Sequence, residues 1–536
     1  MELFYFTGAF LLAAAVIAVW IFRRPSQLSV FDRFTAALIP LSGASLLIEI
    51  AAEVSRGPFW LWNDVRLARG VALGYGYKMY YDGHGGPIIG TMHAPLGFAV
   101  YIWIGLLRNP TLALLAGCTL SALFIFGPMA WVLLRANPTR PSSWKWRILL
   151  FLGCSLMAFF SAGLTYSAFR IHADAAALGF AAMAAAFLYF GDRERTWRDL
   201  GLSAACAVLS VWSKQTLVPL LVALPAFVWM CEGTRQLCRY LTCLAVAGAA
   251  ISALMLAAFG PLQPMWFNMF VVPMREPHLP EKNVLQKFWQ LGTENLLPAA
   301  IILFLLLLPA FISDGGSRPD RGRFLAEHRW LVFGFVGIAM FPTFVAGILK
   351  VGGDINHLSL VSLFMLLAAG TGLGAHLGEL EAARPEILRG AARTFTIIFV
   401  LIGMLRTPIA MFSVAGSRPL RTNSSESAYR FEKAHPGEAY FPFNPLAVLL
   451  ASGKLYHSDI GLKDRELSGY GIGGEQFRRY APRDYRMIAI PTGAPRLTAI
   501  LTQELEGSVR TRGTGDLAGW AVYRFPSDTS DKEKGK

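Results

Sequence analysis

The chain has 536 residues, of which 54% are hydrophobic and 16% charged, and its formal net charge is +14. A soluble globular protein carries about 25% charged residues, so the composition excludes an ordinary soluble protein, a disordered chain and a collagen-like chain. It indicates a membrane protein with several spans. The six cysteines lie in apolar stretches or beside them, which argues against a disulfide framework and a zinc site.

Apolar runs long enough to cross a bilayer recur along most of the chain. A hydrocarbon core of about 30 Å requires about 20 apolar residues in a helix. The first run is not a cleavable signal peptide, because Arg23 and Arg24 follow it instead of preceding it. The runs predict about twelve spans, at residues 4–22, 34–53, 112–134, 148–169, 173–190, 200–212, 216–231, 241–259, 296–312, 330–349, 358–376 and 394–414.

Two apolar segments need a separate interpretation. Residues 95–107 would form a helix of only about 20 Å, which is too short to cross, so a re-entrant or interfacial helix is predicted there. Residues 200–231 are predicted to form a short hairpin, because one long helix would place its two flanking basic loops on opposite sides. The tip of that hairpin is expected at residues 212–215.

Lys and Arg residues in the short loops set the predicted orientation. They fall on one side, which we assign to the cytoplasm, in loops 23–33, 135–147, 193–198, 235–239, 318–329 and 384–393. The opposite, outer side then receives both termini, loop 54–94, loop 260–295, turn 350–357 and the tail from residue 416. Most of the polar chemistry is therefore expected at the outer face.

The tail differs in composition from the rest of the chain. Runs such as 438–443 and 486–491 are typical of strands and are separated by Gly-rich turns. We predict an all-α polytopic membrane domain over residues 1–415, followed by a small extracytoplasmic α/β domain over residues 416–536.

The first outer loop, residues 54–94, holds the candidate catalytic residue. Asp64 follows Trp60 and Trp62 just beyond a predicted span. A carboxylate beside aromatic rings suits a base that acts on an acceptor hydroxyl at the membrane surface. The alternative at this point is that the tryptophans form an interfacial belt and Asp64 caps a helix over residues 65–73.

The same loop offers ligands for a divalent cation. Asp82, His84 and His93 could join Asp64 around Mg²⁺ or Mn²⁺, since carboxylate and imidazole groups bind such ions. No tight ligand spacing supports this interpretation. The metal hypothesis therefore rests on Asp64, Asp82 and His84, beside the alternative that the protein uses no cofactor.

Ionisable residues recur where later spans meet the outer face. Arg170, His172 and Asp174 stand together at the start of span 173–190. A charge at mid-bilayer costs on the order of 3 kcal/mol, so such groups usually line a cavity or pair with each other. The alternative to a ligand role is an Arg170–Asp174 pair at helical spacing.

Other ionisable residues lie at the outer ends of further apolar runs, at Lys214, Arg275, Lys282, Lys350 and Asp354. Converging cations suit an anionic lipid headgroup, because an arginine can bind phosphate through two parallel hydrogen bonds. Snorkelling of each side chain to the interface is the alternative. The candidate substrate-binding residues are Asp82, His84, Arg170, His172, Asp174, Lys214, Lys350 and Asp354.

Taken in chain order, these landmarks resemble the GT-C superfamily of integral-membrane glycosyltransferases, which includes protein O-mannosyltransferases and lipid A aminoarabinose transferases. The resemblance covers roughly residues 34–414. It rests on the motifs Asn63-Asp64, Ala94-Pro95-Leu96, Arg170 four residues before Asp174, Ser213-Lys214-Gln215-Thr216 and Gly352-Gly353-Asp354-Ile355-Asn356.

The resemblance implies a transferase that moves a sugar from a polyprenyl phosphate to a lipid, glycan or protein acceptor at the outer face, with inversion at the anomeric carbon. It implies that Asp64 deprotonates the acceptor hydroxyl. Arg170, Lys214 and Lys350 would hold the leaving phosphate. The Ala- and Arg-rich composition favours a bacterial inner membrane, with the active site and both termini on the periplasmic side.

Other functions stay open on the sequence alone. A transporter or flippase of an anionic lipid-linked substrate would also need outer cations, but the spans show no internal repeat. A polysaccharide polymerase or ligase has related chemistry, and a scaffold would use its C-terminal domain to bind a partner. Nucleic acid is not an expected partner, because the cations lie in the loops that flank spans.

Overall fold

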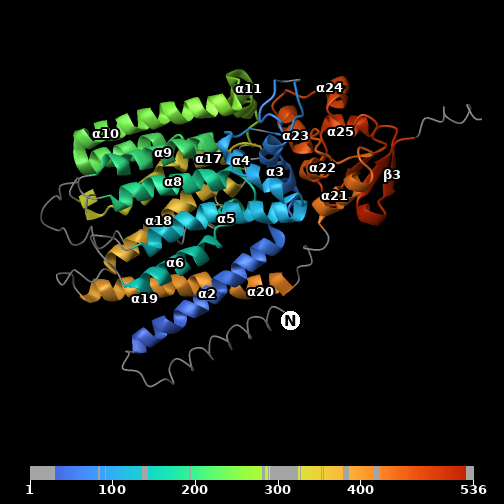
Figure 1. Cartoon of the computed structure of the whole chain (residues 1–536). Helices are drawn as coiled ribbons and strands as arrows, with labels where there is room; N and C mark the ends of the chain where they lie inside the picture. Colours follow the sequence, from blue (N-terminus) through green and yellow to red (C-terminus); the bar gives the residue numbers. More distant parts are fainter. Residues whose placement is uncertain are drawn as a thin grey trace, which may run out of the picture.

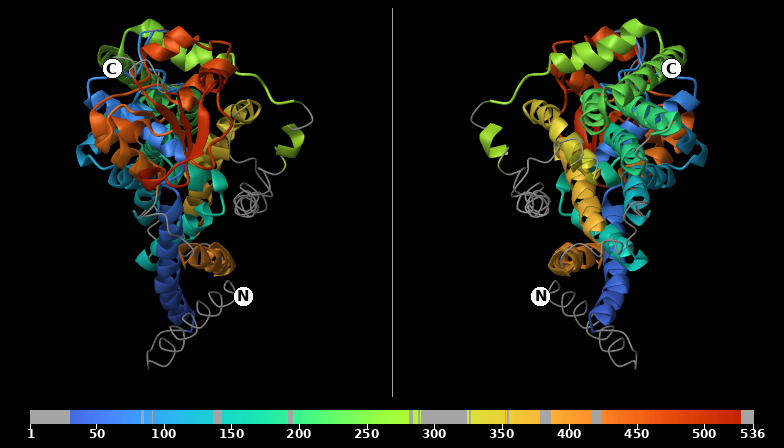
Figure 2. Two further views of the ribbon diagram at one scale, coloured as in Figure 1. Left: turned by 90° about the vertical axis from the view of Figure 1, so that its right-hand side faces the viewer. Right: turned by 90° about the vertical axis from the view of Figure 1, so that its left-hand side faces the viewer.

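The computed structural model describes residues 30–82, 85–90, 92–135, 143–191, 195–280, 284–287, 289, 324–325, 327–351, 353, 355–377, 386–415 and 423–526. Long helices form an elongated bundle, and a smaller domain of helices and strands covers one end of it (Figure 1). The left view of Figure 2 looks onto that end, where the C-terminal residues, in orange and red, lie in front of the bundle.

The bundle and its connecting segments comprise α2 (Val30–Arg56), α3 (Leu61–Gly74), α4 (Leu96–Ala99), η1 (Ile102–Leu107), α5 (Pro110–Leu134), α6 (Trp144–Ala158), α7 (Ala162–Phe169), α8 (Ala173–Phe190), α9 (Trp197–Ser213), η2 (Gln215–Leu217), α10 (Leu220–Phe259), α11 (Leu262–Trp266), η3 (Phe267–Val271), α12 (Val272–Met274), α16 (Leu331–Ala339), α17 (Phe341–Ile348), η4 (Ile355–Leu358), α18 (Ser359–His376), α19 (Glu386–Met404) and α20 (Thr407–Ala415).

Seven helical segments in the described residues are long and apolar enough to cross a membrane, or up to eight if one bent pair counts as a span. The chain is therefore a multi-pass membrane protein. The count stays below the predicted twelve for several reasons. Predicted spans 4–22 and 296–312 lie outside the described residues, α9 has only 17 residues, and two predicted spans fall within one candidate of 45 residues.

Predicted span 148–169 is not one straight helix, which corrects the sequence interpretation. It consists of α6 and α7, bent by 96°. The Ser161 side chain accepts a hydrogen bond from the Leu164 amide, 3.3 Å away, and so caps α7. Arg406 donates to the Phe159 carbonyl at the break. These two contacts provide partners for backbone groups that the bend removes from the helical ladder.

The element α10 consists of two helical halves that meet at Gly233 and form a hairpin. Gly233 has φ 79° and ψ −174°, a conformation that interrupts the helix. The Glu232 carboxylate, next to this break, pairs with Arg195 at the start of α9. The first half of α10 therefore runs antiparallel to α9. The predicted short hairpin over 200–231 has this geometry, with η2 at its tip.

The short apolar segment 95–107 also has the predicted character. It forms α4 and η1, which together are too short to cross. Arg108 follows with φ 48° and ends the 3₁₀ turn. The segment lies at the same end of the bundle as α3 and α11 (Figure 1).

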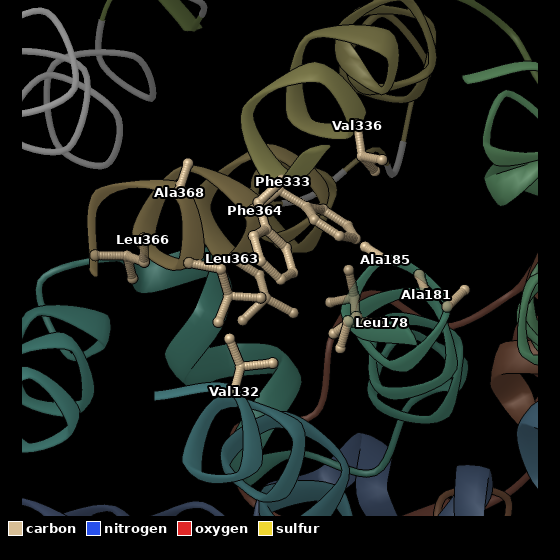
Figure 3. Close-up of a cluster of buried hydrophobic side chains, with 14 of the residues drawn as sticks. Val132, Leu178, Ala181, Ala185, Phe333, Val336, Leu363, Phe364, Leu366 and Ala368 are labelled. Atoms are coloured by element: carbon tan, nitrogen blue, oxygen red, sulfur yellow. The ribbon is translucent and has the colours of Figure 1, made fainter. Parts of the chain in front are cut away.

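The core of the bundle is built around α8 and α18, whose apolar windows are the most buried of the candidate spans. Alanines on α8 allow close approach of α9, and two serines of α9 donate to α8 carbonyls: Ser210 to Ala177 and Ser203 to Ala184, each at 2.8 Å. Larger side chains of α5, α16 and α18 fill the remaining space. Figure 3 shows this packing, with Val132, Leu178, Phe333 and Phe364 among its members.

Residues 423–526 form a four-stranded sheet flanked by helices. The strand order is β1-β2-β4-β3, with β1 parallel to β2 and the other neighbours antiparallel. The strands β1 and β2 lie within the predicted runs 438–443 and 486–491. The elements are α21 (Ser424–Ala434), β1 (Ala439–Tyr440), α22 (Pro445–Ser452), α23 (Asp459–Leu467), α24 (Gly474–Arg479), β2 (Met487–Ile490), α25 (Ala499–Glu504), β3 (Val509–Arg512), η5 (Gly515–Leu517) and β4 (Ala521–Arg524).

This C-terminal domain docks onto the first loop through polar contacts. The Tyr77 hydroxyl donates to the Gly453 carbonyl over 3.1 Å, and the Ile88 amide donates to His457 Nδ1 over 2.8 Å. The segment α11–α12 joins the same interface, since Arg465 donates to Asn268 over 3.0 Å. The first loop, the segment after α10 and the C-terminal domain, all predicted to be outer, therefore lie at one end of the bundle.

Candidate functional site

Asp174 is the centre of a buried polar cluster at this end of the bundle. It lies in the first turn of α8, and its carboxylate receives three partners from different elements. Lys214, at the end of α9, donates to Oδ1. Asn356, in η4, donates to Oδ2 over 2.7 Å, and His172 Nδ1 lies 2.6 Å from the same oxygen. All four side chains are buried.

The His172 contact fixes the position of its proton. A nitrogen 2.6 Å from a carboxylate oxygen must donate, so Nδ1 carries the hydrogen. The Asp174 amide lies 3.3 Å from the same nitrogen, a longer and weaker contact. Nε2 is then left with a free lone pair. The pair His172–Asp174 has the arrangement of an imidazole oriented by a carboxylate, which can take a proton at Nε2.

The histidines at the site are held neutral. Burial lowers the pKa of His172 to about 4 against the opposing effect of Asp174, and the positive charge of Arg66 contributes to this lowering. Burial also places the pKa of His93 well below its usual value, with contributions from His172 and Lys214. The two rings meet edge to face, with centroids 5.0 Å apart. His172 can therefore accept a proton at neutral pH.

A group of cations and aromatic rings adjoins His172. Arg66 donates to the Tyr166 hydroxyl over 2.8 Å, and its guanidinium lies 5.3 Å from the Trp60 ring centroid. Arg170 lies 5.4 Å from the same ring. The Tyr166 ring centroid is 6.1 Å from that of His172. We call Trp60, Arg66, Tyr166 and Arg170 the cation patch. Its members are only partly buried, so it links the buried dyad to the surface.

Arg170 does not pair with Asp174, so the helical Arg170–Asp174 alternative is wrong. Arg170 ends α7 in an extended conformation and donates to the Gly57 carbonyl. The Asp174 carboxylate is instead shared by Lys214, Asn356 and His172. A break in the helix between α7 and α8 separates the two residues.

Asp64 is buried beneath the C-terminal domain. Its side chain is 1% exposed, and Oδ1 accepts a hydrogen bond of 2.7 Å from the Leu446 amide in the first turn of α22. It is not the cap of its own helix, because α3 already begins at Leu61 with Trp60 as N-cap. The predicted capping role over residues 65–73 is therefore wrong. Asp64 caps α22, more than three hundred residues along the chain.

Burial raises the pKa of Asp64 to about 7, against the effect of nearby Ser425 and the Leu446 amide. Oδ2 has no hydrogen bond of ordinary geometry among the described residues. Because the folded-state pKa lies above the unfolded value, the folded state retains the proton more strongly, and stability falls as pH rises through about 7. One pKa unit corresponds to about 1.4 kcal/mol, so the effect reaches a few kcal/mol at most.

We expect Asp64→Asn to reduce this pH dependence. Thermal unfolding of the purified protein in detergent at about pH 5 and about pH 8 measures it. Wild type should lose more stability between the two values than the variant, which keeps an acceptor for the Leu446 amide. Glu475→Gln, at an exposed position on α24, is the control and should behave as wild type. An identical pH dependence in wild type and Asp64→Asn would contradict the assignment.

The remaining predicted site residues lie elsewhere. Asp82 lines a cleft with Asn268, Asp464 and Arg465, between the first loop and the C-terminal domain. Lys350 donates to the Pro273 carbonyl and lies 4.0 Å from Glu276. The structure thus brings together His172, Asp174 and Lys214, with Arg170 beside them. His84 and Asp354 lie outside the described residues.

The described part of the chain contains no assembled set of metal ligands. No three His, Cys, Asp or Glu side chains are placed there to hold an ion. The carboxylate of Asp174 is already occupied by Lys214 and Asn356. Of the predicted ligands, Asp64 faces α22 and Asp82 lines the cleft, while His84 falls outside the described residues.

The sequence interpretation did not select three residues of the site: Arg66, Tyr166 and Asn356. Each had a usable signal. Arg66 follows Trp60 and Trp62 and stands two positions after Asp64, Tyr166 precedes Arg170 in the same motif, and Asn356 ends the Gly-Gly-Asp-Ile-Asn turn. None of these positions showed which partner it would meet, because the partners come from other elements.

Solved structures similar to this chain exist, although sequence comparisons find no match. No protein-family model matches the sequence, and no curated protein matches it significantly. The crystal structure of ArnT from Cupriavidus metallidurans bound to undecaprenyl phosphate superposes with a TM-score of 0.54 at 13% identity, covering 91% of this chain and 98% of ArnT. The apo ArnT structure gives 0.54 at 12% identity, over 90% and 97%.

The arabinosyltransferase EmbB from Mycobacterium smegmatis gives a TM-score of 0.40 at 12% identity, covering 95% of this chain and 49% of EmbB. The two ArnT structures establish the fold. The chain has a GT-C-like fold, as the resemblance in the sequence predicted.

Proposed function

We propose that this protein is a membrane glycosyltransferase that moves a sugar from a polyprenyl phosphate donor to an acceptor hydroxyl. The observation that carries the proposal is the His172–Asp174 dyad beside the cation patch, in a chain with the fold of ArnT. An ArnT structure contains undecaprenyl phosphate, which supports a lipid of that class as the donor carrier. We place the reaction at the outer face of a bacterial inner membrane, with a lipid, glycan or protein as acceptor.

The cation patch is proposed to hold the phosphate of the donor. Arg66 and Arg170 each lie against the Trp60 ring, which holds their guanidinium groups in the partly exposed cation patch. Guanidinium groups bind phosphate oxygens through charge-assisted hydrogen bonds. Negative charge grows on the phosphate as the sugar leaves, so the same contacts stabilise the transition state.

His172 is proposed to be the base. Nε2 takes the proton of the acceptor hydroxyl while the acceptor oxygen attacks the anomeric carbon from the side opposite the phosphate. The bond between the anomeric carbon and the phosphate oxygen breaks, and its electrons leave with the phosphate. Asp174 stabilises the imidazolium that forms. This sequence of events inverts the anomeric configuration.

Asp64 remains the second candidate for the base, as the sequence suggested. A base must reach the hydroxyl it deprotonates, and the Asp64 carboxylate faces the amides of α22.

Lys214 is proposed to position Asp174, since its Nζ donates to that carboxylate. Lys350 is proposed to order α12, where it donates to the Pro273 carbonyl.

We expect Arg66→Ala and Arg170→Ala each to weaken donor binding by about tenfold or more, because a hydrogen bond to a charged group contributes about 1.5–3 kcal/mol. The measurement is the affinity of the purified protein for polyprenyl phosphate, together with its release from a labelled donor. Arg135→Ala is the matched control, since Arg135 also lies against aromatic rings, those of Trp131 and Phe190. Unchanged donor affinity in both variants would place the phosphate site elsewhere.

A further inference from the structure

The C-terminal domain carries an open groove that the proposed reaction does not use. It lies between the loop that follows β2 and the edge strand β3, and its volume is about 770 Å³. Ligand sites typically have volumes of about 300–1,000 Å³. The residues that matter for its chemistry are Ile490, Arg496, Arg510, Arg512, Ala521 and Tyr523.

Strand register places two of the arginines on one face with an aromatic ring. In the β3–β4 pair, Arg510 is opposite Tyr523 and Arg512 is opposite Ala521. Directly opposed residues point to the same side of a sheet, and alternate residues of a strand share that side. Arg510 and Arg512 therefore flank a floor made of Tyr523 and Ala521. The Arg510 guanidinium lies 6.0 Å from the Tyr523 ring centroid.

The charge of the groove is one-sided. Arg496, Arg510 and Arg512 are exposed, and none has an ion-pair partner in the described part of the chain. No Asp or Glu is among the residues that line the groove. The border of the groove is uncrowded at Gly493 and Gly519, because a Cβ added at either residue would meet no atom within 4 Å. The groove thus presents unpaired guanidinium groups over a partly apolar floor.

We propose that this groove binds an acidic saccharide, with its carboxylate or phosphate groups on the three arginines and a sugar ring on Tyr523. Guanidinium groups match such anions in geometry as well as charge. The choice of a saccharide rests on the proposed function, in which a glycan is one of the acceptors that the transferase would bind. Figure 1 shows β3 on the side of the domain that faces away from the helical bundle, so lipid headgroups of the same bilayer do not reach it.

Binding to the purified full-length protein tests this proposal. The probes are an oligogalacturonate, a neutral maltodextrin and polyglutamate, measured by calorimetric titration. We expect the oligogalacturonate to bind wild type and the maltodextrin not to bind. In Arg510→Glu with Arg512→Glu the affinity should fall by about tenfold or more, equal to about 1.4 kcal/mol or more.

The control is a matched double charge reversal outside the groove, Arg483→Glu with Arg524→Glu. Arg524 lies on β4 next to Tyr523 in sequence, so its side chain points to the opposite face. This control should bind the oligogalacturonate as wild type does. Equal affinity of wild type and the groove variant, or binding of maltodextrin, would overturn the proposal. Polyglutamate that binds as tightly as the oligogalacturonate would show an acidic-peptide site instead.

The same groove variant separates this proposal from the proposed function. Its release of polyprenyl phosphate with a small acceptor should equal that of wild type, because none of its changes lies at the dyad or the cation patch. Loss of saccharide binding with retained release supports the groove alone. Wild type that binds the oligogalacturonate but releases no polyprenyl phosphate would support the groove and contradict the transferase.

Discussion

His172→Gln should reduce sugar transfer by on the order of 10²- to 10⁴-fold, the range that a positioned general base contributes. Glutamine fills much of the same volume and can still donate to Asp174, but it cannot take a proton from the acceptor. The measurement is the rate of polyprenyl phosphate release under saturating donor. Donor affinity should stay near that of wild type, since the phosphate contacts belong to Arg66 and Arg170.

The pH profile distinguishes the two candidate bases. Neutral His172 is the active form, and its pKa is about 4. The ratio kcat/KM should therefore rise with pH through about 4 and then level off. If Asp64 were the base, its raised pKa would place this rise near pH 7 instead.

Asp64→Asn is the matched control for His172→Gln. It changes a buried acid at the same end of the bundle and keeps the acceptor for the Leu446 amide. We expect it to retain most of the transfer activity. Full loss of transfer in Asp64→Asn together with activity in His172→Gln would assign the base to Asp64, as the sequence first suggested.

Asp174→Leu should have the largest effect on stability, about 3–5 kcal/mol, which is the usual cost of leaving one partner of a buried ion pair alone. Lys214 is 1% exposed, and its ammonium would lose its only carboxylate partner in the described residues. Asn356 would lose its acceptor as well. We expect a lower yield of folded protein and a lower thermal midpoint in detergent.

A second change separates stability from catalysis. Asp174→Leu combined with Lys214→Met removes both charges, and replacing a buried pair by apolar residues is often neutral for stability. The double variant should recover thermal stability but not transfer, because His172 has lost the group that orients it. Asp199→Asn, at a half-buried position in the first turn of α9 and away from the Asp174 cluster, is the control. Recovery of transfer in the double variant would show that Asp174 has only a structural role.

Much of the membrane domain followed from local sequence. Hydropathy located the spans that became α2, α5, α8 and α18, because each depends only on a continuous apolar run. The same information placed Lys214 at a hairpin tip and Asp174 at the start of a span. The prediction of one straight span at 148–169 was wrong, since no proline marks the bend and the contact that stabilises it comes from Arg406, in the turn between α19 and α20.

The sequence by itself determined the class of the protein: a multi-span membrane chain with ionisable residues gathered at one end, and landmarks of the GT-C fold. Only the tertiary structure decided their roles, because the partners lie far apart along the chain. Lys214 is 40 residues from Asp174, and Leu446 is 382 residues from Asp64. Hydropathy and spacing show the type of a residue and its position relative to the spans. They do not show that one carboxylate is oriented toward an imidazole while the other is buried under a helix.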